Sequence, residues 1–334
     1  MALLAALLAA GVAVGVQAAG FVPEQEANLF LGLVRFDGTA IYFKLLLTSC
    51  LLFTVGFTLT DRGHFHDAPT ASEYWYLLAG VAPGLFLMVS TGHLLMLYLA
   101  TELVSIASYV LAGYRLRSAN SAEAGIKYLI YGAVSSGILL YGISLLYGLG
   151  GSLWLHAPEF GANLAAAPAP AALLSLGLVF AGLAFKVSLV PFHFWVPDVY
   201  AGAPPAVAGF LASASKAAGF VLLLRLTKVI LPHAVLFGGW QLLLAAAALA
   251  ALVLGNVAAL RQGRFRRLMA YSGIAHAGFL TLALVAATPG AWAGLGFYLG
   301  IYVLMNLLAF SLAGTLEAAT GSGHIADWGA RIQP

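Results

Sequence analysis

Apolar runs long enough to cross a bilayer recur along this chain and constrain its fold more than any other feature. An α-helix needs about 20 mostly apolar residues to span the hydrocarbon core, where helices and closed barrels alone satisfy every backbone polar group. We therefore predict an all-α polytopic membrane protein, a single membrane domain over residues 1–334. About ten candidate spans lie near 2–20, 39–60, 75–91, 93–114, 125–149, 171–196, 203–230, 236–260, 266–287 and 290–317.

Composition supports this class and excludes others. Only 8% of the residues are charged, against roughly 25% in an ordinary soluble domain. The formal net charge of +3 is small and spread over loops, which gives no case for nucleic acid as a partner. Cys50 is the single cysteine, so the sequence has no internal disulfide and no iron–sulfur or haem attachment pattern. We therefore expect no cofactor in this chain, and any redox chemistry belongs to a partner.

The basic residues predict the orientation. With ten spans, successive connections lie on alternate sides of the membrane. One side has most of the arginines, whereas the other has Arg35, Arg225 and Lys228. The arginine-rich side should be cytoplasmic, which places both termini in the cytoplasm and the chain in the plasma (inner) membrane. Its arginines are Arg62, Arg115, Arg117, Arg261, Arg264, Arg266, Arg267 and Arg331.

The stretch GLAFKVSLVPFHFWVPDVYAGAPP, residues 182–205, places a lysine inside an apolar run and a proline five positions later. Proline has no N–H for the carbonyl of Val187, and its ring clashes with that carbonyl, so Pro191 should break the helix about one turn beyond Lys186. Irregular backbone at membrane depth persists only where protein or a water-filled cavity surrounds it. A buried lysine beside a broken helix is therefore the leading site hypothesis.

Few other ionisable residues lie at membrane depth. Glu102 and Lys216 each lie near the middle of a span, whereas Lys127 lies closer to a span end. Each central charge costs roughly 2.5–3.5 kcal/mol on insertion scales. Such residues must face each other, water or a partner. A structural Glu–Lys pair is one alternative, although the lysines outnumber the carboxylates, and for Lys127 the alternative is a side chain that reaches to the membrane interface.

Structural interpretations also apply to neighbouring residues. His193 and Asp198, beyond the predicted break, fit a role in capping or hydrogen-bonding a loop, and His276 fits an interhelical hydrogen bond. The small residues Gly209, Ser213 and Ala217, at a spacing of four, would let another helix approach the Lys216 span closely. The aromatic side chains after the break are expected in an interfacial belt. They are Phe192, Phe194, Trp195 and Tyr200.

Several long motifs together resemble one family. LYLATELVSIASYVLAGYRL, EAGIKYLIYGAVSSGILLYGISLLYG, GLAFKVSLVPFHFWVPDVYAGAPPAV with LASASK, and RRLMAYSGIAHAGF occur in this order. They closely resemble the subunit N family of proton-pumping NADH-quinone oxidoreductase (complex I), over about residues 70–330. The resemblance implies an antiporter-like, proton-translocating subunit without a redox centre, bound to other antiporter-like and small membrane-arm subunits. It places flavin and iron–sulfur clusters in partner subunits.

The family has fourteen helices built around two inverted five-helix repeats, each with one broken helix. By resemblance, residues 75–230 form the first repeat and residues 236–334 an incomplete second one. The family's proton-relay residues fall on Glu102, Lys127, Lys186 and Lys216, and His193 is a further candidate. This chain departs from the family at both ends and stops before the second broken helix. Either the sequence is part of a longer one, in which case the encoding gene should continue past Pro334 through about four more spans, or the outer exit route for protons is built differently.

Three other classes remain open at this stage. A multi-subunit cation/proton antiporter shares the buried lysine and the broken helix, and a membrane-arm subunit of a related hydrogenase or of the photosynthetic complex has the same architecture. A membrane scaffold is the alternative without transport. The sequence lacks G-x-x-x-x-G-K-[ST], which speaks against an ATP-driven pump.

Overall fold

A computed structural model describes residues 2–21, 27–60, 71–115 and 117–331, and it is almost entirely helical. The first half contains α1 Ala2–Ala19, β1 Ala27–Leu29, β2 Val34–Phe36, α2 Gly38–Thr60, α3 Ala71–Ser90, α4 Leu94–Ala112, α5 Ala119–Gly150 and α6 Pro158–Ala166. The second half contains α7 Ala169–Val187, α8 Val196–Gly202, α9 Pro205–Phe210, the π-helix η2 Leu211–Ser215, α10 Lys216–Ile230, α11 Ala234–Ala259, α12 Phe265–Ala286, α13 Pro289–Thr320 and α14 Ile325–Arg331.

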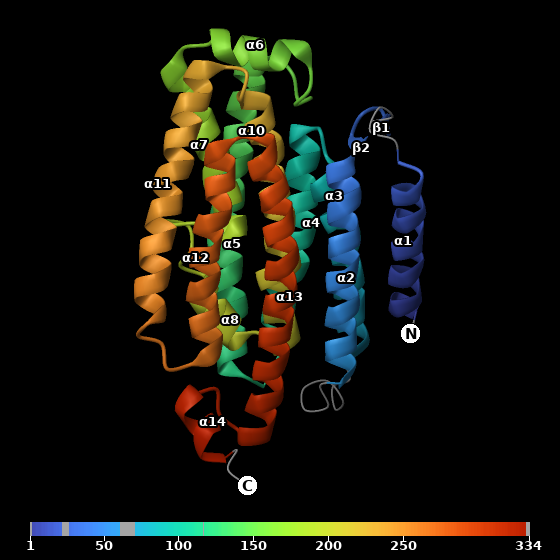
Figure 1. Cartoon of the computed structure of the whole chain (residues 1–334), viewed down its shortest axis with the longest axis vertical. Helices are drawn as coiled ribbons and strands as arrows, with labels where there is room; N and C mark the ends of the chain where they lie inside the picture. Colours follow the sequence, from blue (N-terminus) through green and yellow to red (C-terminus); the bar gives the residue numbers. More distant parts are fainter. Residues whose placement is uncertain (1, 22–26, 61–70, 116, 332–334) are drawn as a thin grey trace.

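The prediction of ten spans is confirmed, because the described residues contain 10 helices long and apolar enough to cross a membrane. The α9–η2–α10 rod, Pro205–Ile230, is buried from Pro205 to Thr227 and lies at the centre of the bundle, whereas only 11% of α1 is buried. Figure 1 shows the long helices nearly parallel, with α1 at the edge beside α2. Lys216 therefore lies on the most enclosed helix, and α7, which carries Lys186, packs against it.

The predicted grouping of the arginines matches the arrangement of the connections. The α4–α5 connection, with Arg115 and Arg117, and the α11–α12 connection lie at the same end of the bundle, with α14 (Figure 1). The β1–β2 hairpin and α6 lie at the opposite end. Arg62 lies outside the described residues.

The predicted break is present, but the helix ends earlier than expected. α7 stops at Val187, and Ser188 follows in the left-handed conformation with φ 66°. The residue before a proline is disfavoured in the α region, and proline has no N–H to donate, so the helix cannot continue through Val190 and Pro191. The chain then turns and resumes as α8 at Val196. The predicted span 171–196 is thus one helix followed by irregular backbone.

A second irregularity, which the sequence did not predict, lies directly before Lys216. Residues Leu211–Ser215 form a π-helix between α9 and α10. π-Helical turns widen the helix, are rare and occur often at functional sites. Both central lysines therefore lie next to a departure from regular α-helix.

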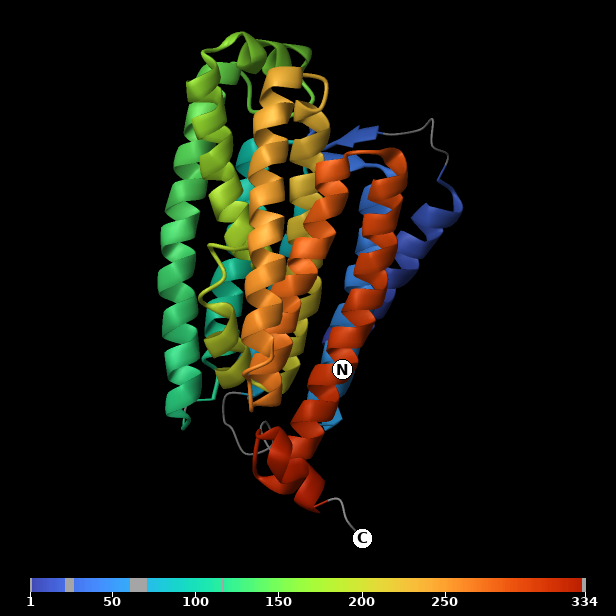
Figure 2. The same ribbon diagram turned by 60° about the vertical axis from the view of Figure 1, so that its left-hand side comes forward.

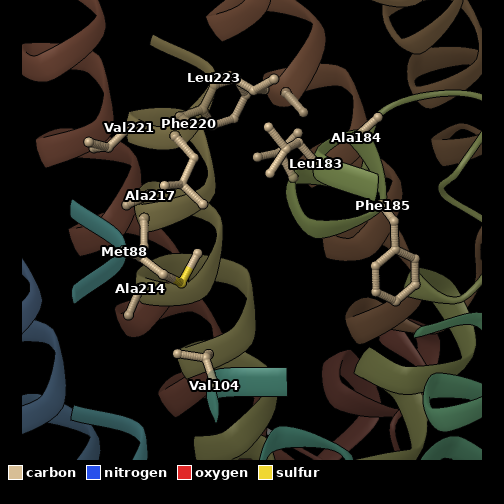
Figure 3. Close-up of a cluster of buried hydrophobic side chains, with 14 of the residues drawn as sticks. Met88, Val104, Leu183, Ala184, Phe185, Ala214, Ala217, Phe220, Val221 and Leu223 are labelled. Carbon is tan, nitrogen blue, oxygen red and sulfur yellow. The ribbon is translucent and has the colours of Figure 1, made fainter. Parts of the chain in front are cut away.

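The two lysine-bearing helices cross in direct contact. A Cβ at Gly219 of α10 would lie 2.7 Å from Cγ1 of Val187 and 3.3 Å from Cγ of Lys186, so only glycine fits at this crossing. Around it, apolar side chains of α3, α4, α7, η2 and α10 form the core shown in Figure 3, with Met88, Val104, Leu183, Ala214 and Phe220. Close packing fixes the position of both lysines.

Two short segments are rich in small residues. The Ala/Pro-rich stretch 162–172 contains the end of α6 at Ala166 and the start of α7 at Ala169. The small-residue row does permit close helix approach, since a Cβ at Gly209 would lie 3.2 Å from Cβ of Phe310 on α13. The β1–β2 hairpin was not predicted.

A buried ion pair lies at the end of the bundle that carries the β1–β2 hairpin. The Arg225 guanidinium donates to both carboxylate oxygens of Asp37, at 2.8 and 3.0 Å, and also to the carbonyl of Val89. Burial alone would raise the pKa of Asp37, but the hydrogen bonds and charge of Arg225 outweigh it and hold that pKa below its usual value. The pair therefore joins α2, α3 and α10 while remaining charged.

We expect Arg225→Met to destabilise the protein by about 3–5 kcal/mol, because the buried Asp37 carboxylate loses both hydrogen bonds from its guanidinium partner and keeps only the longer contact with Arg35, at 3.8 Å. Thermal unfolding in detergent measures this loss. Since the folded pKa of Asp37 is depressed, the contribution of the pair is present above the unfolded pKa, about 3.9, and disappears as the pH falls through the lower folded pKa. The double variant Asp37→Leu/Arg225→Met should recover most of the stability, and an equal loss in single and double variants would contradict the account.

Candidate functional site

Lys186 is buried and bound to a neutral partner. Its exposed fraction is 2%, and its Nζ donates to Oγ of Ser105 on α4 at 2.9 Å. Ser105 in turn donates to the carbonyl of Thr101 at 2.7 Å, so its oxygen can accept from the lysine. The ammonium group thus contacts a hydroxyl and has no directly bound carboxylate among the described residues.

Glu102 lies near Lys186 without forming an ion pair with it. Both side chains, with Ser105 and Tyr109, line an enclosed cavity of about 10 Å³, close to the minimum that holds one water molecule. Glu102 is half-buried, and within the described part of the chain it makes no ion-pair contact with Lys186. Glu102 and Lys186 therefore line one cavity without the direct contact that a structural ion pair between them requires.

The expected interfacial aromatic belt is wrong for two of its four members. Trp195 is 2% exposed and Tyr200 is fully buried. Trp195 stacks on Tyr128 of α5, with ring centroids 4.3 Å apart, and its indole N–H donates to the carbonyl of Phe185. These rings enclose the break because it lies inside the bundle, whereas Phe194 is 61% exposed.

Lys216 is fully buried and also has only neutral partners. Its Nζ donates to the carbonyl of Gly273 on α12 at 2.9 Å and to the hydroxyl of Tyr302 on α13 at 3.2 Å. The same Nζ lies 5.5 Å from the centroid of the Tyr302 ring, which provides a weak cation–π attraction. Neither partner carries a negative charge.

His276 forms the interhelical hydrogen bond that its sequence context predicted. A ring nitrogen of His276 lies 2.6 Å from the hydroxyl of Tyr298 on α13. Its ring centroid also lies 5.3 Å from that of Tyr302. His276 therefore belongs to the polar surroundings of Lys216.

Lys127 lies in an ion-pair cluster at the arginine-rich end. Its Nζ lies 2.6 Å from a carboxylate oxygen of Asp198 on α8 and 2.6 Å from one of Glu123. Arg267 of α12 contacts the other oxygen of Asp198 at 3.0 Å. Two carboxylates thus hold Lys127 at this end of the bundle, and Asp198 joins three helices instead of capping a loop.

His193 is buried, with an exposed fraction of 4%, and its Nδ1 has no hydrogen-bond partner among the described residues. The structure does not bring it to Lys127, which lies with Asp198. His193 stays a candidate on its position in the break alone.

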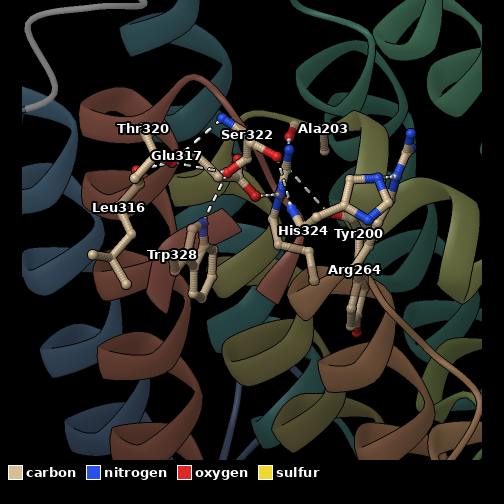
Figure 4. Close-up of polar contacts among 10 residues, drawn as sticks. Tyr200, Ala203, Arg264, Leu316, Glu317, Thr320, Ser322, His324 and Trp328 are labelled. Atoms are coloured by element: carbon tan, nitrogen blue, oxygen red, sulfur yellow. Dashed lines mark hydrogen bonds and ion pairs between the residues drawn. The ribbon is translucent and has the colours of Figure 1, made fainter. Parts of the chain in front are cut away.

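Arg266 binds the C-terminal end of α8. Arg266 donates to Glu317 at 2.8 Å and to the carbonyl of Ala203 at 2.7 Å, and it also donates to the carbonyl of Tyr200. Figure 4 shows these three partners, Glu317, Ala203 and Tyr200, close together. Two adjoining cavities of about 440 and 120 Å³ flank these contacts, and both are lined by Asn120, Ala201 and Arg264. The arginine-rich end thus carries a polar recess next to Asp198.

Sequence reasoning missed several partners of the lysines. Ser105, Gly273 and Tyr302 each contact a buried ammonium group. The first two lie inside the quoted motifs, which gave a weak signal, but Tyr302 has no sequence signal. Within the described ranges, His, Cys, Asp and Glu side chains do not gather in threes as a metal site would require.

Fold and site together define a class: a polytopic membrane protein of transporter type, with one buried lysine beside a helix break and another beside a π-helical turn. The family described as the NADH:quinone oxidoreductase/Mrp antiporter transmembrane family matches residues 91–330. The chain belongs to this family.

Individual relatives agree with this assignment. The chain is 40% identical over 310 residues to NADH-quinone oxidoreductase subunit N of Chlorobium chlorochromatii, covering 91% of this chain and 60% of that one. A chain of respiratory complex I from Thermus thermophilus is 36% identical, with a TM-score of 0.73, and the match covers 94% of this chain and 70% of that chain. A chain of the Mrp complex of Dietzia sp. has a TM-score of 0.81 at 21% identity, covering 95% of this chain and 59% of that chain, which shows the shared fold alone. The chain spans about 60% of the length of the curated relatives it matches.

Proposed function

We propose that this chain translocates protons as an antiporter-like subunit of a respiratory NADH-quinone oxidoreductase, coupled to electron transfer in partner subunits. One observation carries the proposal: Lys186 is buried beside a helix break and Lys216 beside a π-helical turn, and among the described residues their Nζ atoms hydrogen-bond to neutral oxygens. A structural ammonium group would have a carboxylate partner, because an unpaired buried charge is costly. Neutral partners suit an amine that binds and releases a proton, because they can hydrogen-bond to both its charged and its neutral form.

The relay follows from proximity and burial. Burial disfavours the charged form of an amine and of a carboxyl group alike, and a nearby opposite charge favours it. A change in the charge of Glu102 therefore alters how readily Lys186 holds a proton, so the two groups titrate as a coupled pair. Lys216, on the helix that crosses α7 at Gly219, is the next carrier.

Proton entry is proposed at the arginine-rich end. The polar recess there reaches Asp198, which holds Lys127 next to the second half of the broken helix. Lys127 is bound to two carboxylates, so its movement would open or close the route between the recess and the interior. In this arrangement Lys127 controls access, and Lys186 and Lys216 carry the proton.

The wider assembly is inferred from the relatives. A match to subunit N of NADH-quinone oxidoreductase and to a chain of respiratory complex I supports antiporter-like and small membrane-arm subunits as partners. Flavin and iron–sulfur clusters would then lie in those partners. We also propose the five-helix repeat arrangement, 75–230 followed by 236–334.

Orientation is tested by labelling. We expect a cysteine placed at Gln262, in the α11–α12 connection, to stay unlabelled by a membrane-impermeant thiol reagent on intact cells, because arginine-rich connections stay cytoplasmic. A Cys50→Ala background removes the other thiol, which is itself fully buried. Permeabilised cells provide the positive control. Strong labelling of intact cells would invert the topology.

Proton pumping by the assembled complex in proteoliposomes tests the function itself. Loss of either central lysine should lower the number of protons moved per electron while electron transfer continues. Unchanged pumping in both single variants would contradict the proposed function.

A further inference from the structure

The polar recess at the arginine-rich end carries an excess of positive charge. It comprises the two adjoining cavities of about 440 and 120 Å³. Each carboxylate group that lines it already has a basic partner, and these groups balance in charge. They are Glu317 with Arg266, and Asp198 and Glu123 with Lys127 and Arg267. Arg264 lines both cavities in addition, so one positive charge is left over.

Arg264 is available to an anion in the recess. Its side chain is exposed, and its Nε donates to Nε2 of His324 at 3.3 Å, a contact that Figure 4 shows. Among the described residues no carboxylate group forms an ion pair with it. Arg264 is also the N-cap residue of α12, where no side chain caps the helix, so the positive end of the helix dipole adds to its charge. A bound anion would meet no competing carboxylate at this arginine.

Arg267 supplies a second donor to the same recess. It lines the smaller cavity together with Arg264. Its Nε is buried and makes no hydrogen bond to any residue that the structure describes. Buried donors without a partner are uncommon in folded proteins, and the planar guanidinium group matches the oxygens of a phosphate group. The recess thus has the chemistry of a phosphate site.

The outer face of α5 leads from this recess into the membrane. Asn120, in the first turn of α5, lines both cavities. Farther along the helix, Ile130, Val134 and Tyr141 recur at helical spacing on one face, and all three are exposed. Apolar side chains exposed at membrane depth contact acyl chains. A ligand with an anionic head group and an acyl chain therefore fits both the recess and the helix face, whereas a free phosphate would use the recess alone.

We propose that the recess binds the phosphate group of an anionic phospholipid, whose acyl chain lies along the outer face of α5. Arg264 and Arg267 donate to the phosphate oxygens, and Asn120 contacts the glycerol part of the head group. Basic pockets between transmembrane helices are known to bind such head groups. The inference goes beyond the proposed function and does not depend on it, because the lipid can bind whether or not the chain moves protons.

Photo-cross-linking in lipid nanodiscs tests the site. The assembled complex is placed in phosphatidylcholine nanodiscs with increasing fractions of a phosphatidylglycerol that carries a photoactivatable acyl chain, and mass spectrometry locates the labelled peptides. The outer face of α5 should be labelled. Arg264→Gln should raise the lipid fraction needed for half-maximal labelling about tenfold, the effect of losing one hydrogen bond to a charged group. Arg261→Gln is the matched control, because it removes an exposed arginine of the same connection that lines neither cavity, and it should label like the parent.

Two further measurements identify the source of the phosphate group. Ile130→Ser places a hydroxyl on the apolar face and should weaken labelling by the lipid, whereas glycerol 3-phosphate, which has no acyl chain, should not displace the lipid at equal concentration. Displacement by glycerol 3-phosphate would assign the recess to a free phosphate ligand and overturn the lipid site. Labelling of Arg264→Gln at the parental level, or equal labelling of the parent by a photoactivatable phosphatidylcholine, would overturn it as well.

Discussion

Lys186→Ala is expected to lower proton translocation through this chain by roughly two orders of magnitude, the usual effect of losing a group that transfers protons. The reason is geometric: the Nζ of Lys186 bonds to Ser105 beside the cavity that Glu102 also lines. Assembly should survive, because removal of a buried cation also removes its desolvation cost, and Ser105 keeps its bond to Thr101. Protons moved per electron in proteoliposomes, with complex abundance measured in parallel, check this result.

Lys186→Arg is the informative companion variant. Arginine keeps the positive charge but does not release its proton in proteins, so a proton carrier should fail with arginine as it does with alanine. A cation that only stabilises the bundle should work with either lysine or arginine. Normal pumping by Lys186→Arg would contradict the carrier role.

Lys216→Met is expected to produce a loss of similar size, on the order of 100-fold. Methionine fills the site with a flexible apolar chain, so the fully buried position keeps its packing while the proton-binding amine disappears. Tyr302 and Gly273 lose a hydrogen-bond donor but no counter-ion, which limits the effect on stability.

Lys228→Ala is the matched control for Lys216, because it removes a lysine from the same helix at an exposed position near the helix end. It should leave pumping unchanged. Equal losses from both substitutions would show that α10 tolerates no change of charge and would contradict a specific role for Lys216.

The ten spans, the break and the central lysines could be predicted because each is a local property of the sequence. An uninterrupted apolar run, a proline five positions after a lysine, and a lone charge in a span can be read without knowledge of neighbours. Even so, the position of the helix end was wrong by one turn, since α7 stops at Val187. The restriction that Pro191 places on its preceding residues reaches further back than the proline itself.

The partners of the lysines could not be predicted because they come from distant segments. Ser105 meets Lys186 across α4 and α7, and Tyr302 meets Lys216 across α10 and α13. Hydropathy gives the depth of a residue but not the helix that it faces. The same limit explains why Asp198 was interpreted as a loop cap, although it binds Lys127 and Arg267.

The π-helix before Lys216 was not predicted for a different reason. The segment LASAS consists of small and moderately apolar residues that also suit a regular α-helix. Ser213 in this turn donates to the carbonyl of Val303 on α13, at 3.4 Å. Hydropathy and helix propensity alone do not distinguish the two helix types.

The central claim is that Glu102 and Lys186 act in one proton relay. Pumping by the double variant Glu102→Gln/Lys186→Ala, at normal complex abundance in proteoliposomes, tests it most directly, because residues of one relay are not additive. The account predicts that the double variant pumps about as poorly as the worse of the two single variants. Recovery of full pumping on restoring charge neutrality would instead show that the two charges only hold α4 and α7 together, and that protons pass elsewhere.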